Sequence, residues 1–207
     1  MKKIGIMGGT FNPIHNGHLA LAQAAYEFCG MDEVWFMPSG VSYLKSQEDI
    51  VAGQHRLKMT ELAVRNTAHF KCSDMEVYRE GYTYTADTLL LLHEKYPEDK
   101  FYFIMGADSL FGLPKWREPE KIAALSTLVT VVRDDIDVQE LLAQKALVET
   151  TLGAKIIMVP FQKVNISSSM IRKKLSEDEL VADLLPEKVL EYIETHGLYK
   201  ENVHGRP

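Results

Sequence analysis

Short apolar runs alternate with helix-type segments along the whole chain. Six runs have the continuous apolar character of strands buried on both faces: Lys3–Met7, Glu33–Met37, Phe70–Val77, Lys100–Met105, Leu128–Val132 and Lys155–Val159. The helix-type segments are Gly17–Cys29, Gln54–Arg65, Ala86–Lys95, Glu118–Ala124, Gln139–Thr150, Ser169–Leu175 and Pro186–Thr195. This alternation predicts an α/β fold, a doubly wound parallel sheet with helices on both faces and a Rossmann-like topology.

The chain is expected to form one domain over residues 1–207. Its 207 residues, 46% of them hydrophobic, suffice for a sizeable core, and no repeat, low-complexity tract or Pro/Gly linker divides them. The C-terminal helical part, about 166–200, is expected to pack on the sheet.

Charge and composition exclude several classes of partner. The formal net charge of −6 lacks the basic bias of nucleic-acid-binding proteins, so we expect no polynucleotide partner. No apolar run approaches the roughly 18 residues of a membrane span, and the start resembles no signal peptide. Cys29 and Cys72 show no disulfide or metal spacing and sit among apolar residues, which favours a reducing cytoplasm.

Unusual residues follow most of the predicted strands. They are Gly8-Gly9-Thr10, Pro38-Ser39-Gly40, Gly106-Ala107-Asp108-Ser109, Arg133 and Asn165-Ile166-Ser167-Ser168-Ser169. Because open α/β sheets bind ligands in the crevice beyond the carboxyl ends of their strands, these five segments are expected to converge on one site.

The stretch GGTFNPIHNGH, residues 8–18, has the chemistry of a phosphate cradle. Gly8 and Gly9 lack a Cβ, so the backbone can turn there and a ligand can approach its N–H groups. The helix that begins at Gly17-His18 has unpaired first-turn amides and a dipole that favours an anion. The spacing matches neither a P-loop nor the Gly-x-Gly-x-x-Gly of a dinucleotide fold, so another nucleotide-binding geometry is required.

His15 and His18 admit three interpretations. As zinc ligands they lack a well-placed third ligand, since the remaining histidines are scattered through the chain. As structural residues they would lie in a loop and cap a helix. As phosphate donors they fit the glycines, the threonine and the helix start around them, and this is the interpretation that we prefer.

These residues carry a resemblance to a known family. GGTFNPIHNGH resembles the Thr/His-x-Gly-His signature of the nucleotidyltransferase superfamily related to class I aminoacyl-tRNA synthetases, and residues 166–172, ISSSMIR, resemble its second signature. Three internal segments, YTADTL at 84–89, MGADSL at 105–110 and LPKW at 113–116, are similar to those of bacterial nicotinate-nucleotide adenylyltransferases, and the similarity extends to Gly197-Leu198-Tyr199.

The resemblance implies transfer of AMP from ATP to nicotinate mononucleotide, giving deamido-NAD and pyrophosphate. A mononucleotide phosphate is already an anionic nucleophile, so catalysis requires alignment and charge neutralisation and no general base. The resemblance assigns the catalytic residues as Thr10, His15, His18 and Arg172, and extends the ATP site to Gly8, Gly9, Phe11, Gly106, Asp108, Ile166, Ser168 and Ser169. Mg²⁺ is expected to arrive with ATP and not to occupy a protein cage. A homo-oligomer is possible.

The substrate side is assigned in the same way to Lys45, Thr85, Asp108, Trp116 and Arg133. Trp116 would pack on the nicotinate ring, Asp108 would bind a ribose hydroxyl or cap a short helix, and Thr85, at a helix start, would help to bind the carboxylate. Helix N–H donors suit a carboxylate better than a carboxamide, which favours nicotinate over nicotinamide.

Three departures from the family pattern are present. Asn12 stands where members usually carry Asp, a change that we expect a loop to tolerate. The usual Pro-Pro-His-Lys is replaced by VSYLK at 41–45, which leaves Lys45 in a different loop, and Asp134-Asp135 follow Arg133 and could pair with it.

Alternatives remain open at this point. An enzyme that prefers nicotinamide mononucleotide is the nearest. Phosphopantetheine adenylyltransferase and glycerol-phosphate cytidylyltransferase carry both signatures, but they are typically shorter and lack the segments at 84–88 and 113–116. A non-catalytic nucleotide-binding module is disfavoured because Thr10, both histidines and Arg172 are retained.

Overall fold

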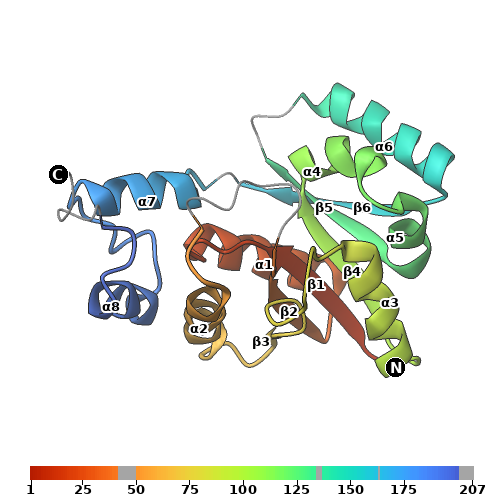
Figure 1. The fold of residues 1–207 in the computed structure, drawn as a ribbon. Helices are drawn as coiled ribbons and strands as arrows, with labels where there is room; N and C mark the ends of the chain where they lie inside the picture. Colours follow the sequence, from red (N-terminus) through yellow and green to blue (C-terminus); the bar gives the residue numbers. More distant parts are fainter. Residues whose placement is uncertain (42–49, 134–136, 163, 201–207) are drawn as a thin grey trace.

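The structure is a computed structural model that describes residues 1–41, 50–133, 137–162 and 164–200. Its centre is a parallel sheet of strand order β3-β2-β1-β4-β5-β6 (Figure 1). The strands are β1 (Lys3–Gly9), β2 (Glu33–Pro38), β3 (Phe70–Cys72), β4 (Lys100–Gly106), β5 (Thr127–Arg133) and β6 (Lys155–Phe161). The predicted parallel sheet is therefore confirmed.

Helices cover both faces of this sheet. The described helices are α1 (Asn16–Cys29), α2 (Gly53–Val64), α3 (Thr85–Lys95), α4 (Ala107–Gly112), α5 (Pro119–Leu125), α6 (Val138–Leu152), α7 (Ser168–Ser176) and α8 (Glu187–Thr195). A 3₁₀ turn, η1 (Leu113–Lys115), follows α4. Within the described residues, none of these helices is long and apolar enough to cross a membrane.

The burial of β1 explains why the strands read as continuous apolar runs. Ile4 and Ile6 pack into a core with α3, α4, α5 and α6, whereas Met7 packs into a second core with α1, α2, α7 and α8. Because side chains alternate along a strand and both faces are covered, apolar residues occur at successive positions.

Two predicted elements need correction. The third strand ends at Cys72 and not at Val77, because the chain turns at residues 74–77, where the Val77 N–H donates to the Asp74 carbonyl oxygen (3.1 Å). The short helix expected at Asp108 begins at Ala107 as α4 and is capped by Gly106, whereas η1, which follows it, is too short to show a helical period and was not predicted.

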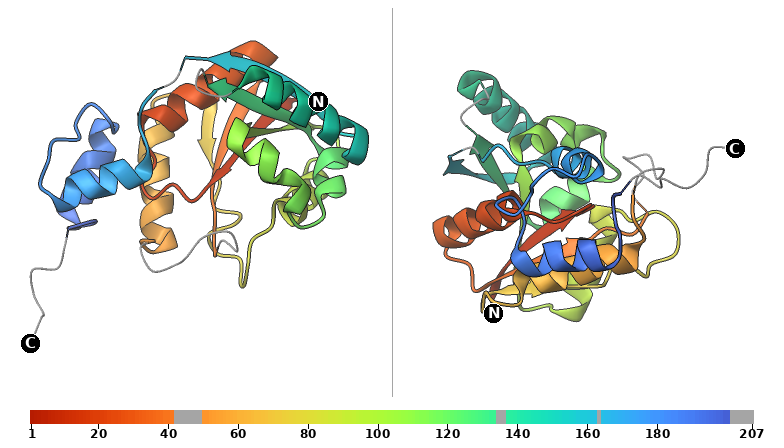
Figure 2. Two further views of the ribbon diagram at one scale, coloured as in Figure 1. Left: turned by 90° about the horizontal axis from the view of Figure 1, so that it is seen from above. Right: turned by 90° about the vertical axis from the view of Figure 1, so that its left-hand side faces the viewer.

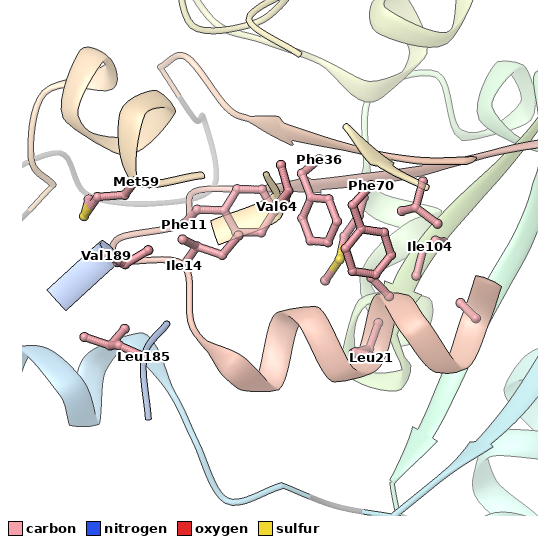
Figure 3. Packing of buried hydrophobic residues seen from close by; sticks show 14 of the residues in the cluster. Phe11, Ile14, Leu21, Phe36, Met59, Val64, Phe70, Ile104, Leu185 and Val189 are labelled. Atoms are coloured by element: carbon pink, nitrogen blue, oxygen red, sulfur yellow. The ribbon is translucent and has the colours of Figure 1, made fainter. Parts of the chain in front are cut away.

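The C-terminal part shares the second core with the sheet and extends past its end. Residues of α7 and α8 belong to the same core as Met7, α7 and α8 project beyond the sheet, and α8 packs on α2 (Figures 1 and 2). Figure 3 shows Met59 of α2 with Leu185 and Val189 from the C-terminal part, next to Phe11 and Ile14 of the chain after β1. This packing places the start of α7 beside the first loop, by which we mean residues 8–15, from the end of β1 to the start of α1.

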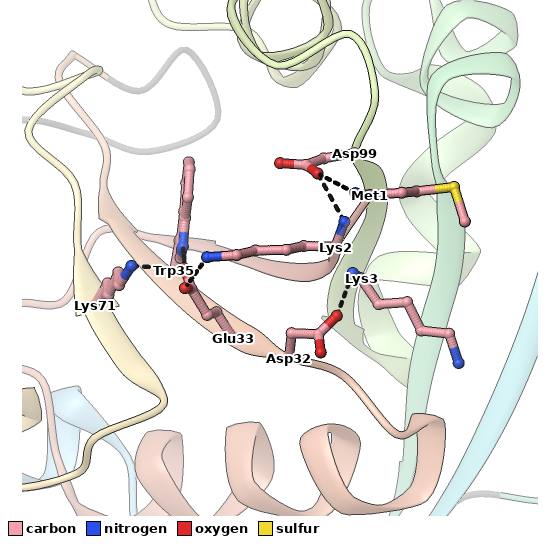
Figure 4. A network of polar contacts seen from close by, with 8 residues as sticks. All are labelled: Met1, Lys2, Lys3, Asp32, Glu33, Trp35, Lys71 and Asp99. Atoms are coloured by element: carbon pink, nitrogen blue, oxygen red, sulfur yellow. Dashed lines mark hydrogen bonds and ion pairs between the residues drawn. The ribbon is translucent and has the colours of Figure 1, made fainter.

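A polar network fixes the opposite, amino-terminal end of the strands (Figure 4). Glu33 accepts from Lys2 Nζ (2.7 Å) and Trp35 Nε1 (2.8 Å) and pairs with Lys71 Nζ (2.8 Å), which ties β2 to β1 and β3. Asp99 accepts from the Lys2 N–H (2.7 Å). The carboxyl ends, at which the strand order reverses between β1 and β4, are left for ligands.

Candidate active site

Two neighbouring cavities lie at the carboxyl ends of the strands. The larger has a volume of about 460 Å³ and the smaller about 210 Å³. Gly8, Gly9 and Thr10 line both of them. The first loop therefore forms a wall shared by two spaces, each of which can hold part of a ligand.

The larger cavity brings together the two signatures from opposite ends of the chain. Of the predicted ATP and catalytic residues, its walls contain Gly8, Gly9, Thr10, Phe11, His15, His18, Ile166, Ser168, Ser169 and Arg172. Asn12, Gly17, Leu21, Ile50, Phe161, Val164 and Ser167 complete the described lining.

The two glycines at the end of β1 have different roles. A Cβ on Gly8 would meet no atom closer than Phe103 Cε2, at 3.8 Å, so the hydrogen atom there leaves open space toward the cavities. A Cβ on Gly9 would lie 2.8 Å from Phe11 Cε1, which a folded protein does not tolerate without movement. Phe11, at φ 47°, is buried in the core. Gly8 therefore gives clearance to a ligand, whereas Gly9 gives it to Phe11.

His15 and His18 stack on each other, with ring centroids 3.7 Å apart and ring planes 24° apart. His15 is the N-cap of α1 and only 5% exposed, and its backbone N–H lies 3.3 Å from His18 Nδ1. Since Nδ1 accepts this bond, a neutral His18 carries its hydrogen on Nε2. Within the described residues no group of three or more His, Cys, Asp or Glu side chains is arranged to hold a metal ion.

The second signature binds the first loop directly. Ser168 Oγ donates to the Pro13 carbonyl oxygen (2.9 Å), and Arg172 Nη1 donates to the Asn12 carbonyl oxygen (2.9 Å). Ser167 is the N-cap of α7, since its Oγ accepts from the Met170 N–H (3.2 Å). The two signatures thus form one hydrogen-bonded unit.

Asn12 is a buried anchor of the loop, and the oxygen that makes its contacts is one that both Asn and Asp supply. It is 4% exposed, and its Oδ1 accepts from the Tyr199 hydroxyl (2.9 Å) and the Val51 N–H (3.2 Å). Burial raises the pKa of Tyr199 above its ordinary range, although Arg172 and Arg56 oppose the shift. The end of the described chain is therefore fastened to the first loop.

The smaller cavity contains two of the predicted substrate residues. Thr85 is the first residue of α3, and Trp116 packs edge-on against Phe103 with ring centroids 6.1 Å apart. Glu76 also lines the cavity; it is buried, which raises the pKa of its carboxyl group, and its Oε1 accepts from the Thr88 hydroxyl (2.7 Å). Nothing in the local sequence pattern marked Glu76.

Other predicted residues are not among the walls of either cavity. Gly106 is the N-cap of α4 and Asp108 lies exposed in its first turn, so Asp108 does not cap that helix as predicted. Arg133 ends β5, but its side chain is outside the described structure, and Lys45 lies outside the described residues.

Comparisons with known proteins agree with this architecture. A family model described as cytidylyltransferase-like matches residues 6–174. The probable nicotinate-nucleotide adenylyltransferase of Lachnoclostridium phytofermentans is 45% identical over 96% of this chain and 100% of its own length. The nicotinate-nucleotide adenylyltransferase of Bacillus subtilis is 39% identical over 97% of this chain and 100% of its own length.

Solved structures share the fold. Nicotinic acid mononucleotide adenylyltransferase of Plasmodium falciparum, complexed with NaAD, superposes with a TM-score of 0.80 at 23% identity, covering 99% of this chain and 100% of that one. The same protein complexed with APC gives a TM-score of 0.78 at 22% identity, over the same shares of the two chains.

Proposed function

Because the chain belongs to the cytidylyltransferase-like family and, within it, to the nicotinate-nucleotide adenylyltransferases, we propose that it transfers AMP from ATP to nicotinate mononucleotide, giving deamido-NAD and pyrophosphate. The observation that carries this proposal is the wall shared by the two cavities. ATP fits the larger cavity with its helix starts and signatures, and the mononucleotide fits the smaller one. The two phosphates then meet at Gly8, Gly9 and Thr10.

The transfer forms one bond and breaks one. A phosphate oxygen of nicotinate mononucleotide attacks the α-phosphorus of ATP, while the bond from that phosphorus to the oxygen bridging to the β-phosphate breaks and pyrophosphate leaves with the electron pair. The attacking oxygen is already anionic, so the site has to align the two anions and neutralise charge on the leaving group.

The residues of the first loop and of α7 supply these functions. We assign His18 Nε2–H and the Thr10 hydroxyl to the phosphoryl group in transfer, with His15 stacked behind His18. Ser169 and the start of α7 face the β- and γ-phosphates, and Arg172 adds positive charge there. Ser168, whose hydroxyl hydrogen goes to Pro13, holds the loop.

On the substrate side, Trp116 packs against the pyridine ring and the first-turn amides of α3, at Thr85, bind the carboxylate. Mg²⁺ enters with ATP: the described lining of the larger cavity offers hydroxyl, imidazole and guanidinium groups and no carboxylate, which suits a metal held mainly by phosphates and water. Lys45, Arg133 and Asp108 remain proposed substrate residues, and Gly106 and Asp108 remain proposed residues of the ATP site.

Pyrophosphate release tests the function. The protein is incubated with ATP and Mg²⁺ and, in parallel, with nicotinate mononucleotide, nicotinamide mononucleotide or phosphopantetheine. We expect release mainly with nicotinate mononucleotide. Faster release with nicotinamide mononucleotide would show a preference for the carboxamide substrate, and no release with either pyridine nucleotide would refute the assignment.

The role of His18 is tested by His18→Ala. If His18 stabilises the transition state, this change lowers kcat far more than it weakens ATP binding. Equal losses in the two would reduce His18 to a binding residue.

A cytoplasmic location is proposed as well, favoured by the free thiols of Cys29 and Cys72. Homo-oligomer formation stays a prediction, and sedimentation of the purified protein tests it.

A further inference from the structure

Arg56 of α2 is a buried cation behind the first loop. Its side chain comes from a helix that neither signature includes, and the residue is only 3% exposed. Nη1 donates to the Thr10 carbonyl oxygen (2.8 Å) and Nε to the Val51 carbonyl oxygen (3.1 Å), while Nη2 lies 3.5 Å from the Gly40 carbonyl oxygen. The guanidinium group therefore holds the backbone of three separate segments at once.

None of these partners carries a compensating charge. Arg56 forms no ion pair with a carboxylate of the described residues, and among those residues the phenol of Tyr199 is the ionisable group that favours its charged form. Burial lowers the pKa of Arg56, but a guanidinium group stays protonated at neutral pH. A buried charge is costly unless an opposite charge or a set of hydrogen bonds offsets it, so this position needs an explanation.

The contact between Arg56 and the Thr10 carbonyl oxygen explains why a charge is buried here. Thr10 lines both cavities, so the bond from Nη1 ends on the wall at which the two phosphates meet in the proposed reaction. In a buried setting the charge of Arg56 is screened less than that of a surface arginine. An anionic ligand in the cavities would offset this charge, for which the described residues supply no carboxylate partner.

We propose that Arg56 is a positioning residue of the phosphate site, which fixes the main chain at Thr10 and supplies a positive charge from behind the loop. Arg172 does the corresponding work from the other side, since it donates to the Asn12 carbonyl oxygen (2.9 Å). Two guanidinium groups, from α2 and α7, thus hold carbonyl groups two residues apart. The proposal rests on the proposed function, because it concerns the phosphates of the same two substrates.

The test compares Arg56→Met with Arg65→Met. Arg65 lies exposed at the C-terminal end of the same helix, so its substitution changes the net charge equally without touching the loop. The affinity of each variant for inorganic pyrophosphate is measured by calorimetry, together with kcat, both KM values and the thermal midpoint. We expect Arg56→Met to lose at least about tenfold in pyrophosphate affinity and in kcat/KM for ATP, whereas Arg65→Met stays within about twofold.

Arg56→Lys tests the positive charge separately from the hydrogen bonds that fix the main chain. It also provides the test if the Arg56→Met variant does not fold. Lysine keeps the charge but cannot span the carbonyl groups of Thr10, Val51 and Gly40 with one ammonium group. We expect pyrophosphate affinity within about threefold of the parent protein, with kcat lowered at least about tenfold. A folded Arg56→Lys protein with the parental kcat would overturn the positioning role.

A purely structural arginine gives a different pattern. Arg56→Met would then lower the thermal midpoint but leave pyrophosphate affinity equal to that of the Arg65→Met control, and this result overturns the proposal. The failure of the proposed function is a separate outcome, in which the parent protein itself forms no deamido-NAD from ATP and nicotinate mononucleotide.

Discussion

Replacing Gly8 with alanine distinguishes the role of Gly8 in ligand binding from its role in the stability of the fold. The new Cβ would meet only Phe103 Cε2, at an ordinary 3.8 Å, and φ at Gly8 is not in the left-handed region. A Gly→Ala change at a compatible position stabilises by about 0.4–1 kcal/mol, because the unfolded chain loses conformational freedom. For a chain of this size, a change of 1 kcal/mol moves the thermal midpoint by about 2–4 °C. Gly8→Ala should therefore raise the midpoint of the ligand-free protein by roughly 1–4 °C.

The same methyl group occupies space that the ligands need. Gly8 lines both cavities, so a substituent there lies where the two phosphates approach each other. A misplacement of reacting groups by about 1 Å can cost a factor of about 100 in rate, so we expect kcat/KM to fall by one to two orders of magnitude. Scanning calorimetry and steady-state kinetics on the same preparation test the two halves of this prediction.

Gly9→Ala is the matched control, since its Cβ would lie 2.8 Å from Phe11 Cε1. Overpacking a core costs about 1–3 kcal/mol, which exceeds the gain from the unfolded chain and lowers the midpoint. The reasoning is refuted if Gly8→Ala destabilises the protein as much as Gly9→Ala, or if Gly8→Ala retains the parental kcat/KM.

Three further changes test other parts of the structure. Tyr199→Phe removes the hydroxyl donor to Asn12 Oδ1 and should lower the free energy of unfolding by about 1 kcal/mol in urea titrations; an unchanged midpoint would mean that the C-terminal contact adds no stability. Partial burial alone would raise the pKa of Glu33, but hydrogen bonds from two lysines and an indole lower this pKa from 4.5 to about 2. The ionised carboxylate therefore stabilises the folded protein fully above pH 4.5, and this stabilisation is lost as the pH falls toward 2. Glu33→Gln should therefore flatten the dependence of stability on pH between pH 4.5 and 2, and an unaltered slope contradicts the network of Figure 4. Trp116→Ala should raise KM for nicotinate mononucleotide about tenfold while KM for ATP changes little; equal changes in the two would argue against stacking on the pyridine ring.

The sequence was most informative where periodicity and chemistry repeat. The six strands and the long helices follow from apolar runs bounded by turn residues, and most strand boundaries were right to within two residues. The two signatures were also assigned to one site, because the carboxyl ends of parallel strands meet at one edge and the second signature follows the last strand.

The missed residues share a physical reason. Arg56 lies on the same buried face of α2 as Met59 and Thr60, and its role depends on the carbonyl groups of Thr10 and Gly40, which come from other segments. The anchoring contacts of Asn12 were not predicted because its donors, Val51 and Tyr199, lie far away in sequence. Glu76 lines the smaller cavity because β3 ends at Cys72 and the turn that follows lies against α3, where Thr88 donates to Glu76. Each depends on a contact between distant segments, which a local pattern does not encode.

Three contacts from distant segments end on main-chain carbonyl oxygens of the first loop. The carbonyl oxygens of Thr10, Asn12 and Pro13 accept from Arg56, Arg172 and Ser168. A carbonyl oxygen carries the negative end of the peptide dipole, so each one that faced the cavities would repel a phosphate. Side chains of α2 and α7 donate hydrogen bonds to these carbonyl oxygens, so the oxygens are not free to face a phosphate. The site can then present hydroxyl, imidazole and amide hydrogens to its anionic ligands. This explains why a loop of a few residues at the start of the chain requires helices that the chain makes much later.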